Sequence, residues 1–395
     1  MKVFKFPPEK DDIGLPFFLL AFFLIYGTMH AYVFLKARAA FGFGWTVGAP
    51  LFVLFAFLVS APVLAAHLLV RHGHGNVAQG VALTGFVWMG FLFFLVGLNV
   101  AADAARFLCL PAQRWFGFAG NCSFALGGRG VFLLIVVLAV AFSAYSVFEA
   151  HNIRIVHIRI ATDKLAPGIK TVRVAQISDL HLGLIHRSGK AQRVADLVAA
   201  QRPDILVSTG DLVDGRLTHI EGLAGIFREI HTPMGKFAVN GNHEYYAGLS
   251  HAISFTQDAG FTLLRDEVAV AGEVIRIIGV DDPAQKHMMT GSGRPEPDIP
   301  GSGADDRFTI ILKHRPVVDP DMAGKFDLQL SGHSHQGQLF PFLLLTRLSY
   351  PCSGGSYALP EGGTLHVNRG TGTWGPPMRF LAPPEITIID LERQP

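Results

Sequence analysis

Residues Val172–Gly183 read VRVAQISDLHLG, an apolar run that ends in Asp179-Leu180-His181. This pattern predicts a buried strand with polar side chains at its carboxyl end. Two further runs, Ile205–Thr209 and Lys236–Val239, precede GDLVD and GNHE in the same way. Helical spacing over Arg187–Ala200 and Thr218–Ile230 separates the three runs. The order predicts a βαβαβ series of parallel strands, and an open α/β sheet places its site at the carboxyl ends of adjacent strands.

Further strand-like runs follow and indicate a second, mixed sheet. They lie near Thr262–Leu264, Val274–Val280, Phe308–Leu312, Leu328–Leu330, Thr364–Asn368 and Ile386–Leu391. His314 follows one of these runs, and His333 and His335 follow another. Alternation along a strand would point His333 and His335 the same way, and likewise Asp179 and His181.

These strand ends collect carboxylates, imidazoles and one amide. The candidate metal ligands are Asp179, His181, Asp211, Asn242, His314, His333 and His335. Taken singly, each motif also fits a surface turn or a helix cap, and this alternative is strongest for Asp214. Taken together, they can hold two adjacent divalent cations, with Asp211 bridging them. Mixed nitrogen and oxygen ligands suit Mn, Fe or Zn, and a two-metal site indicates cleavage of a phosphate ester.

The first 150 residues have a different composition from the rest. They contain only 9 of the 33 Lys and Arg and 5 of the 31 Asp and Glu. Four stretches without any of these charges are long enough to cross a bilayer, which takes about 20 apolar residues as a helix. They are about Gly14–Leu35, Trp45–Val70, Gly80–Ala102 and Gly130–Phe148. We therefore expect a transmembrane helical domain at 1–150, a linker or first strand at 151–170, and a catalytic domain at 171–395.

Several features bear on location and partners. Asp103–Arg129 fits an interfacial segment or a plain loop, and His30 and His67 within the spans are read as buried polar residues rather than functional ones. Lys and Arg are slightly more frequent on the side that holds both termini, which favours a cytoplasmic catalytic domain on a bacterial inner membrane. The bilayer is thus one expected partner. No basic run with interleaved aromatics is present, so we expect no nucleic acid partner.

The motifs of residues 172–391 resemble the calcineurin-like metallophosphoesterase superfamily. The stretches GNHEYY at 241–246, GHSHQGQ at 332–338 and RGTGTWGPP at 369–377 are similar to its bacterial membrane-associated branch. The whole layout resembles transmembrane proteins with a metallophosphoesterase domain. Ser334 stands where the branch often has Thr. The resemblance implies a four-layer α/β/β/α sandwich and a metal-dependent phosphoric ester hydrolase.

The resemblance also implies a role for each site residue. Asp179, His181 and His335 would bind a first metal, Asp211 would bridge, and Asn242, His314 and His333 would bind a second. His243 would contact the leaving group or the phosphate, with Asp214 holding its ring. Arg369 or Arg315 would then pair with phosphate oxygens, and a structural role is an equal alternative for Arg369.

The resulting hypothesis is a membrane-anchored phosphoesterase, a phosphodiesterase among the options and manganese among the metals. A hydroxide generated between two cations about 3.5–4 Å apart would attack phosphorus in line. The four spans point to a lipid or lipid-linked substrate, or to anchoring alone. Alternatives are a metal-binding sensor that regulates the membrane module without catalysis, and a tethered nuclease. No P-loop sequence is present, so P-loop nucleotide hydrolysis is not indicated.

Overall fold

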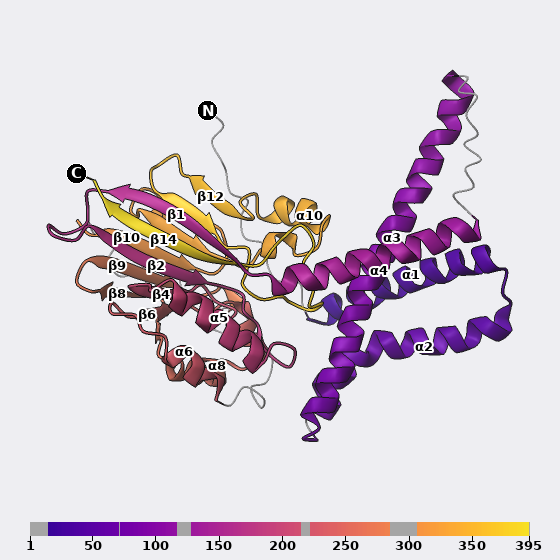
Figure 1. Ribbon diagram of the computed structural model, residues 1–395, viewed down its shortest axis with the longest axis horizontal. Helices are drawn as coiled ribbons and strands as arrows, with labels where there is room; N and C mark the ends of the chain where they lie inside the picture. Colours follow the sequence, from indigo (N-terminus) through magenta and orange to yellow (C-terminus); the bar gives the residue numbers. More distant parts are fainter. Residues whose placement is uncertain (1–14, 71, 117–127, 215–221, 285–305, 395) are drawn as a thin grey trace. The chain divides into compact units, whose positions relative to one another are not determined.

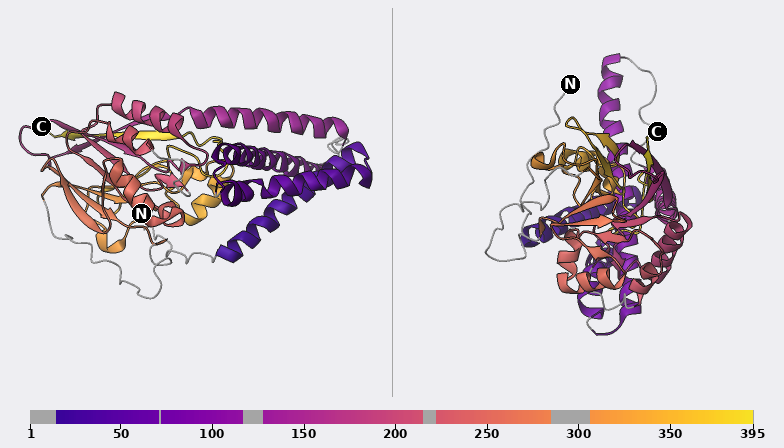
Figure 2. Two further views of the ribbon diagram at one scale, coloured as in Figure 1. Left: turned by 90° about the horizontal axis from the view of Figure 1, so that it is seen from below. Right: turned by 90° about the vertical axis from the view of Figure 1, so that its left-hand side faces the viewer.

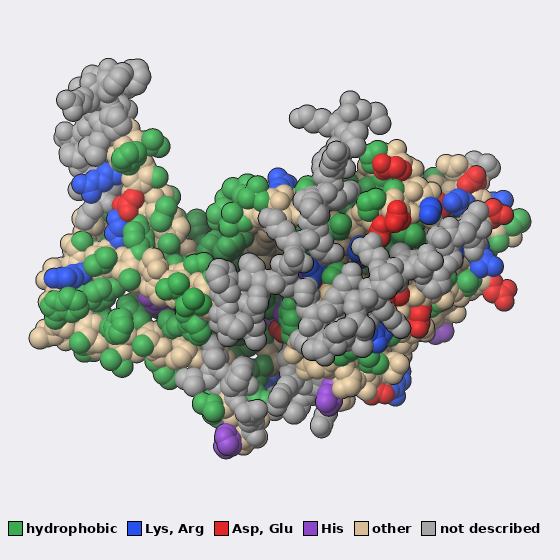
Figure 3. Space-filling model, turned by 180° about the vertical axis from the view of Figure 1, so that it is seen from behind, with side chains coloured by type: hydrophobic (Ala, Val, Ile, Leu, Met, Phe, Trp, Pro, Cys, Tyr) green, Lys and Arg blue, Asp and Glu red, His purple; other side chains and the backbone are tan. Residues whose placement is uncertain are grey.

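The computed structural model describes residues 15–70, 72–116, 128–214, 222–284 and 306–394 of the chain. The chain divides into two compact units, each described here by itself (Figure 1). The helical unit comprises Pro8–Phe148 with Gly375–Met378. The second unit comprises Glu149–Trp374 with Arg379–Pro395, together with residues 1–7. Apolar side chains cover the surface of the helical unit, whereas most acidic side chains lie on the other unit (Figure 3).

The helical unit contains four long apolar helices, as predicted. They are α1 (Leu15–Phe41), α2 (Trp45–Leu64), α3 (Gly75–Phe116) and α4 (Arg129–His151), with the π-helical turn η1 (Ala65–Leu69) after α2. Each contains a segment long and apolar enough to cross a bilayer. Because lipid tails are as apolar as these side chains, their exposure is the expected state of a membrane-spanning helix.

Two helices are longer than the predicted spans. α1 continues through Lys36, and α3 continues through Asp103 as far as Phe116, where an interfacial segment or loop was expected. The two extensions meet, since Lys36 Nζ and Tyr32 Oη donate hydrogen bonds of 2.5 and 2.7 Å to the Asp103 carboxylate. Residues 117–127 of the same predicted segment lie outside the described residues.

His30 is buried and fully engaged within the helical unit. Its Nδ1 lies 2.8 Å from the Tyr26 carbonyl, and its Nε2 accepts a hydrogen bond of 2.9 Å from Trp88 Nε1. These contacts match the interpretation of His30 as a buried polar residue. The side chain of His67 lies outside the described residues.

The second unit is built on two six-stranded mixed sheets, which confirms the predicted α/β architecture. The first sheet has the order β1-β14-β2-β4-β6-β7 and the second has the order β12-β13-β11-β10-β9-β8. The strands of the first are β1 (Arg154–Thr162), β14 (Glu385–Arg393), β2 (Thr171–Ile177), β4 (Ile205–Ser208), β6 (Lys236–Ala238) and β7 (Thr262–Leu263). The strands of the second are β12 (Gly355–Ala358), β13 (Thr364–Val367), β11 (Leu328–Ser331), β10 (Phe308–Lys313), β9 (Ile275–Val280) and β8 (Glu267–Ala271).

The early strands β2, β4 and β6 are parallel, as the βαβαβ order predicted, but the later strands β7 and β14 join this first sheet and not the second, where they were expected. β2, β4, β6 and β7 are parallel neighbours, and β13, β11, β10 and β9 form a second parallel run. The C-terminal strand β14 lies between β1, to which it is parallel, and β2, to which it is antiparallel. The first sheet therefore contains both the first and the last strand of the unit. A small third sheet pairs β3 (Leu182–Gly183) with β5 (Val213–Asp214).

The core is divided into layers by the two faces of each strand. On one face of the first sheet, Ala175 and Ile177 pack with α5 (Ser188–Ala200), α6 (Leu223–Arg228) and α8 (Leu249–Asp258) (Figures 1 and 2). On the other face, Val172 and Val174 pack against the second sheet.

The outer face of the second sheet is also covered. There Ile278 and Ile311 pack with Met322 of the 3-10 turn η2 (Pro320–Met322) and with Phe326. Residues 285–305 lie outside the described residues. The helix–sheet–sheet order places the carboxyl ends of both parallel runs where loops can carry functional groups.

Candidate metal centre

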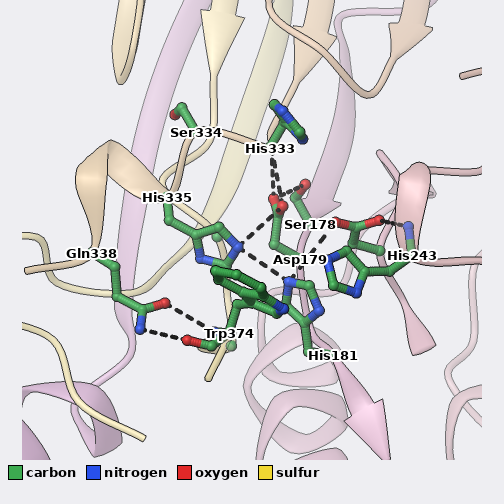
Figure 4. Close-up of polar contacts among 12 residues, drawn as sticks. Ser178, Asp179, His181, His243, His333, Ser334, His335, Gln338 and Trp374 are labelled. Atoms are coloured by element: carbon green, nitrogen blue, oxygen red, sulfur yellow. Dashed lines mark hydrogen bonds and ion pairs between the residues drawn. The ribbon is translucent and has the colours of Figure 1, made fainter. Parts of the chain in front are cut away.

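Polar side chains from both sheets meet at the carboxyl ends of the parallel strands. In the first sheet, β2 leads to Asp179, β4 leads to Asp211, and β6 leads to Asn242 at the start of the short helix α7 (Asn242–Ala247). In the second sheet, β10 leads to His314 and β11 leads to His333. The structure thus brings together groups that lie far apart in the sequence (Figure 4).

The first cluster contains Asp179, His181 and His335, all buried. His181 Nε2 lies 3.1 Å from His335 Nε2, and His335 Nε2 lies 3.4 Å from Asp179 Oδ1. Asp179 is held in place because it accepts hydrogen bonds from the Ser178 hydroxyl and from the backbone N–H of His333. One oxygen and two imidazole nitrogens therefore face a common point.

The second cluster contains Asp211, His314 and His333. His314 Nε2 lies 3.2 Å from Asp211 Oδ2 and 3.1 Å from His333 Nδ1. The other nitrogen of His314, Nδ1, donates to the Thr209 carbonyl at 2.8 Å. This bond leaves the Nε2 lone pair of a neutral His314 free, which is the arrangement of most metal-binding histidines.

Asp211 connects the two clusters. Its Oδ2 lies 3.2 Å from His314 Nε2 in one cluster and 3.8 Å from His181 Nε2 in the other. Asp211 also forms a third potential ligand group with His181 and His243. A carboxylate in this position can offer oxygen to two adjacent ions.

The site loops adopt left-handed backbone turns rather than continuing strands. Asp179, His181, Asp211, His333 and His335 all have φ between 47° and 68°. Strand alternation was therefore the wrong reason to expect the paired ligands to align, although the candidate ligand side chains do converge. Such φ values cost free energy in non-glycine residues, and they persist where surrounding contacts hold them.

Two glycines allow the loops to approach this closely. A Cβ on Gly332 would overlap the Ser178 hydroxyl and the Asp179 carboxylate. A Cβ on Gly210, at φ +95°, would lie 2.6 Å from the Gly241 nitrogen and 2.7 Å from His314 Nδ1. Both positions therefore require glycine for steric reasons.

The donor set fits divalent cations. Two pairs of imidazole nitrogens lie 3.1 Å apart. A ring nitrogen that carries no proton cannot donate a hydrogen bond to its partner, so these close pairs fit a shared cation. Among the described residues, Asn242 Oδ1 is buried without a hydrogen-bond partner. Buried polar groups are normally satisfied, so this oxygen is available as a ligand atom. Mixed nitrogen and oxygen donors suit Mn, Fe or Zn.

His243 lies at the edge of the clusters and is held by a carboxylate. Its Nδ1 lies 3.0 Å from Asp214 Oδ1, and its ring stands 4.7 Å from that of His181. Burial by itself would lower the pKa of His243, but the Asp211 and Asp214 carboxylates outweigh burial and raise it to about 9. For His181 burial prevails, and with the nearby His243 it lowers the pKa to about 4. Neighbouring imidazoles therefore have pKa values shifted in opposite directions, as is common at functional sites.

Glu244 is a residue whose role was not predicted. Its buried carboxylate accepts backbone N–H bonds from Asp211, Leu212 and Val213, and a fourth from Gly241 at 2.7 Å. One side chain thus fixes the loop after β4 and the loop after β6 at the same time. The sequence signal was its place after Asn242 and His243, where a polar turn was the plainer interpretation.

The arginines near the site form hydrogen bonds and ion pairs within the protein. Arg315 pairs with Asp282 through two hydrogen bonds of 2.9 and 3.1 Å, and Arg369 pairs with Glu385. These contacts favour a structural role for both over the predicted contact with phosphate. Arg379, for which no role was predicted, is fully buried and donates to the carbonyls of His335, Gly370 and Gly372.

Aromatic rings flank His243 on the open side of the site. The ring of Tyr246 lies 5.6 Å from that of His243, and the ring of Trp374 lies 5.9 Å from it. Both aromatic side chains are exposed. Gln338 holds the backbone of Trp374 with two hydrogen bonds of 2.8 and 2.9 Å (Figure 4).

Comparison with known proteins agrees with this geometry. The family model for calcineurin-like phosphoesterases matches residues 172–337. An uncharacterized metallophosphoesterase of Aquifex aeolicus is 37% identical over 257 residues, which are 65% of this chain and 98% of that protein. The uncharacterized metallophosphoesterase YkuE of Bacillus subtilis is 33% identical over 267 residues, 62% of this chain and 87% of that one. A transmembrane protein with metallophosphoesterase domain of Danio rerio is 29% identical over 280 residues, 67% of this chain and 63% of that one.

Proposed function

The chain belongs to the calcineurin-like metallophosphoesterases, and we propose that it is a membrane-anchored two-metal enzyme that hydrolyses a phosphate ester of a lipid or lipid-linked substrate. The observation that carries this proposal is the position of Asp211 between two buried clusters of metal-ligand type. A structural zinc domain would need one closed site, whereas hydrolysis by a metal pair needs two adjacent ones.

The proposed ligands follow the clusters. Asp179, His181 and His335 would hold one ion, and His314, His333 and Asn242 would hold the other, with Asp211 shared. Two divalent cations there would polarise the phosphoryl oxygens and make water nucleophilic at neutral pH. The orphaned Oδ1 of Asn242 supports its part, since an uncharged ligand limits the negative charge that faces an anionic substrate.

His243 is the proposed proton donor. Asp214 accepts a hydrogen bond from Nδ1–H of His243, so that Nε2 is the nitrogen left to face a substrate. The hydrogen bond to the Asp214 carboxylate favours the protonated ring, and a protonated ring can stabilise a phosphate or donate a proton to the departing oxygen. No Ser or Cys nucleophile is part of the proposal.

The four candidate spans support location in a membrane. We propose a bacterial inner membrane with the catalytic unit on the cytoplasmic face, from the slight excess of Lys and Arg on the side of both termini. Fusing a reporter active only in the cytoplasm to the C-terminus tests this orientation. An inactive fusion that is present in normal amount would reverse it.

Activity of the metal-reconstituted full-length protein tests the function itself. The panel should span phosphomonoesters, phosphodiesters and lipid pyrophosphates, each with Mn, Fe or Zn, and Asp211→Asn as the matched control. We expect hydrolysis of at least one ester class and none by the variant. A variant that keeps its cellular role without hydrolysis would instead support a regulatory domain.

A further inference from the structure

The catalytic unit carries one concentrated apolar surface. Among its described residues, nine large hydrophobic side chains are exposed. Six of them form what we term the α10 patch: Phe340, Phe342, Leu344, Leu345, Leu348 and Leu381. Two more, Tyr246 and Trp374, flank His243, which leaves only Val270 on β8 elsewhere. Since apolar patches on soluble surfaces usually mark contact sites, this concentration calls for an occupant.

The patch is built on the helix α10 (Phe342–Ser349), which buries none of its side chains. Leu345 is 59% exposed and Leu348 is 77% exposed. Leu343 and Thr346 of this helix are half-buried, whereas its other three leucines are exposed, which is unfavourable in water. Arg347 is exposed in the last turn, and its guanidinium can reach a phosphate layer while its stem lies on apolar surface.

The patch is rigidly joined to the metal centre. α10 follows the ligand-bearing 3-10 turn η3 (His335–Gly337) after four residues, and a Cβ on Gly337 would overlap its first turn. The backbone of Phe340 donates to Phe380 at 3.0 Å, and that of Phe380 donates to Gln338 at 2.9 Å. Gln338 in turn holds Trp374, whose ring faces His243. The segment that leads into α10 is thus tied to the segment that carries Trp374 at the rim of the site.

We infer that the α10 patch binds the hydrocarbon chain of the substrate, so that the enzyme selects amphiphilic phosphate esters. The inference rests on the proposed function and names the surface that confers its lipid selectivity. A phosphate placed at the clusters would pass its chain between Tyr246 and Trp374 to α10, which offers a helix about 12 Å long at 1.5 Å per residue. The chain also contains four candidate membrane spans, so bilayer lipids would be the most abundant apolar molecules near the enzyme.

Chain-length dependence of hydrolysis tests the inference. The full-length protein in neutral phospholipid nanodiscs, loaded with Mn²⁺, is given methyl and dodecyl 4-nitrophenyl phosphate, and butyl and dodecyl phosphate as the monoester pair. The variant L345Q/L348Q removes the two most exposed leucines, and V270Q makes the same change outside the patch. Because α10 buries no side chain, the double variant is expected to fold.

We expect wild type and V270Q to prefer the dodecyl ester over its short partner. L345Q/L348Q should lose about 30-fold in kcat/KM on the dodecyl ester, mainly through KM, which is about 2 kcal/mol at 1.4 kcal/mol per tenfold. Its rate on the short ester should stay unchanged, because the patch contacts only the chain.

Equal chain-length preference in wild type and the double variant would overturn the inference. If the double variant also loses activity equally on both ester lengths, α10 has a structural role. If it instead loses self-association, the patch is an interface between copies. Absence of hydrolysis of every ester by metal-loaded wild type would instead refute the proposed function.

Discussion

Replacing Glu244 by Gln should loosen both the loop after β4, which carries the proposed shared ligand Asp211, and the loop after β6, which carries Asn242. The carboxylate accepts four backbone N–H bonds, two at each oxygen: Leu212 and Val213 at Oε1, and Asp211 and Gly241 at Oε2. Glutamine keeps one carbonyl oxygen for two of these donors. Its NH₂ group would face the other two N–H groups and could accept from neither.

The cost follows from two buried amides left without acceptors. Each unmade buried hydrogen bond costs about 1–3 kcal/mol, so the substitution should cost about 2–6 kcal/mol in the stability of these loops. Because the loops belong to a two-unit protein, a single global unfolding midpoint would not isolate this effect. Amide hydrogen exchange measures local opening directly.

The assay is hydrogen exchange read by mass spectrometry on peptides that cover 205–214 and 238–245. We expect exchange there to accelerate by at least about 30-fold, since 1.4 kcal/mol corresponds to a factor of ten. Glu267→Gln, the same change at an exposed position on β8, should leave exchange at these peptides unchanged. Unaltered exchange in Glu244→Gln would refute the role assigned to this side chain.

Three further substitutions test other parts of the account. Asp211→Asn should abolish hydrolysis and weaken metal binding while membrane insertion stays normal, and undiminished turnover would exclude a shared-ligand role. Arg379→Lys cannot serve all the carbonyls that the guanidinium reaches around His335, so metal affinity by equilibrium dialysis should fall about 10–100-fold, as for other groups that orient ligands. The hydrogen bond from Arg173 lowers the pKa of Asp390, so the pair stabilises the fold above the usual carboxyl pKa of about 3.9, and this contribution is lost as pH falls through the lowered pKa. Asp390→Asn should therefore lower the free energy of unfolding at pH 7 by less than about 1 kcal/mol, which appears as a slightly lower thermal midpoint. The difference in midpoint between variant and wild type should vanish in acid.

The sequence predicted the buried strands of the catalytic unit because they are short apolar runs, but it did not predict the partly exposed edge strands β8 and β12. Val172–Ile177, for example, was expected as a strand, and β2 covers Thr171–Ile177. The convergence of the candidate ligands could be predicted in the same way, because parallel strands end at one edge of a sheet and polar residues follow each of these strands. The four apolar helices followed from length and lack of charge alone.

Long-range pairing could not be read in this way. Nothing local to Ile386–Leu391 indicates that β14 would insert between β1 and β2, because that register depends on partners far away in the sequence. The extension of α3 past Asp103 is another case, since its partner Lys36 lies on a different helix.

Local conformation at the site was also out of reach. Asp179 and His335 adopt left-handed turns only because the neighbouring loops hold them there, so strand alternation was an unsuitable guide. For the same reason the sequence did not predict the roles of Arg379 and Glu244. Their importance comes from the backbone groups they meet, and those groups are contributed by other loops.

The number and spacing of bound ions test the central claim most directly. Full-length protein loaded with Mn²⁺ and freed of loosely bound metal should contain two ions per chain by elemental analysis. Its electron paramagnetic resonance spectrum should show two manganese spins coupled to each other, as expected for ions about 3.5–4 Å apart. One ion per chain, or two ions with the spectrum of isolated manganese, would contradict a paired centre that shares Asp211.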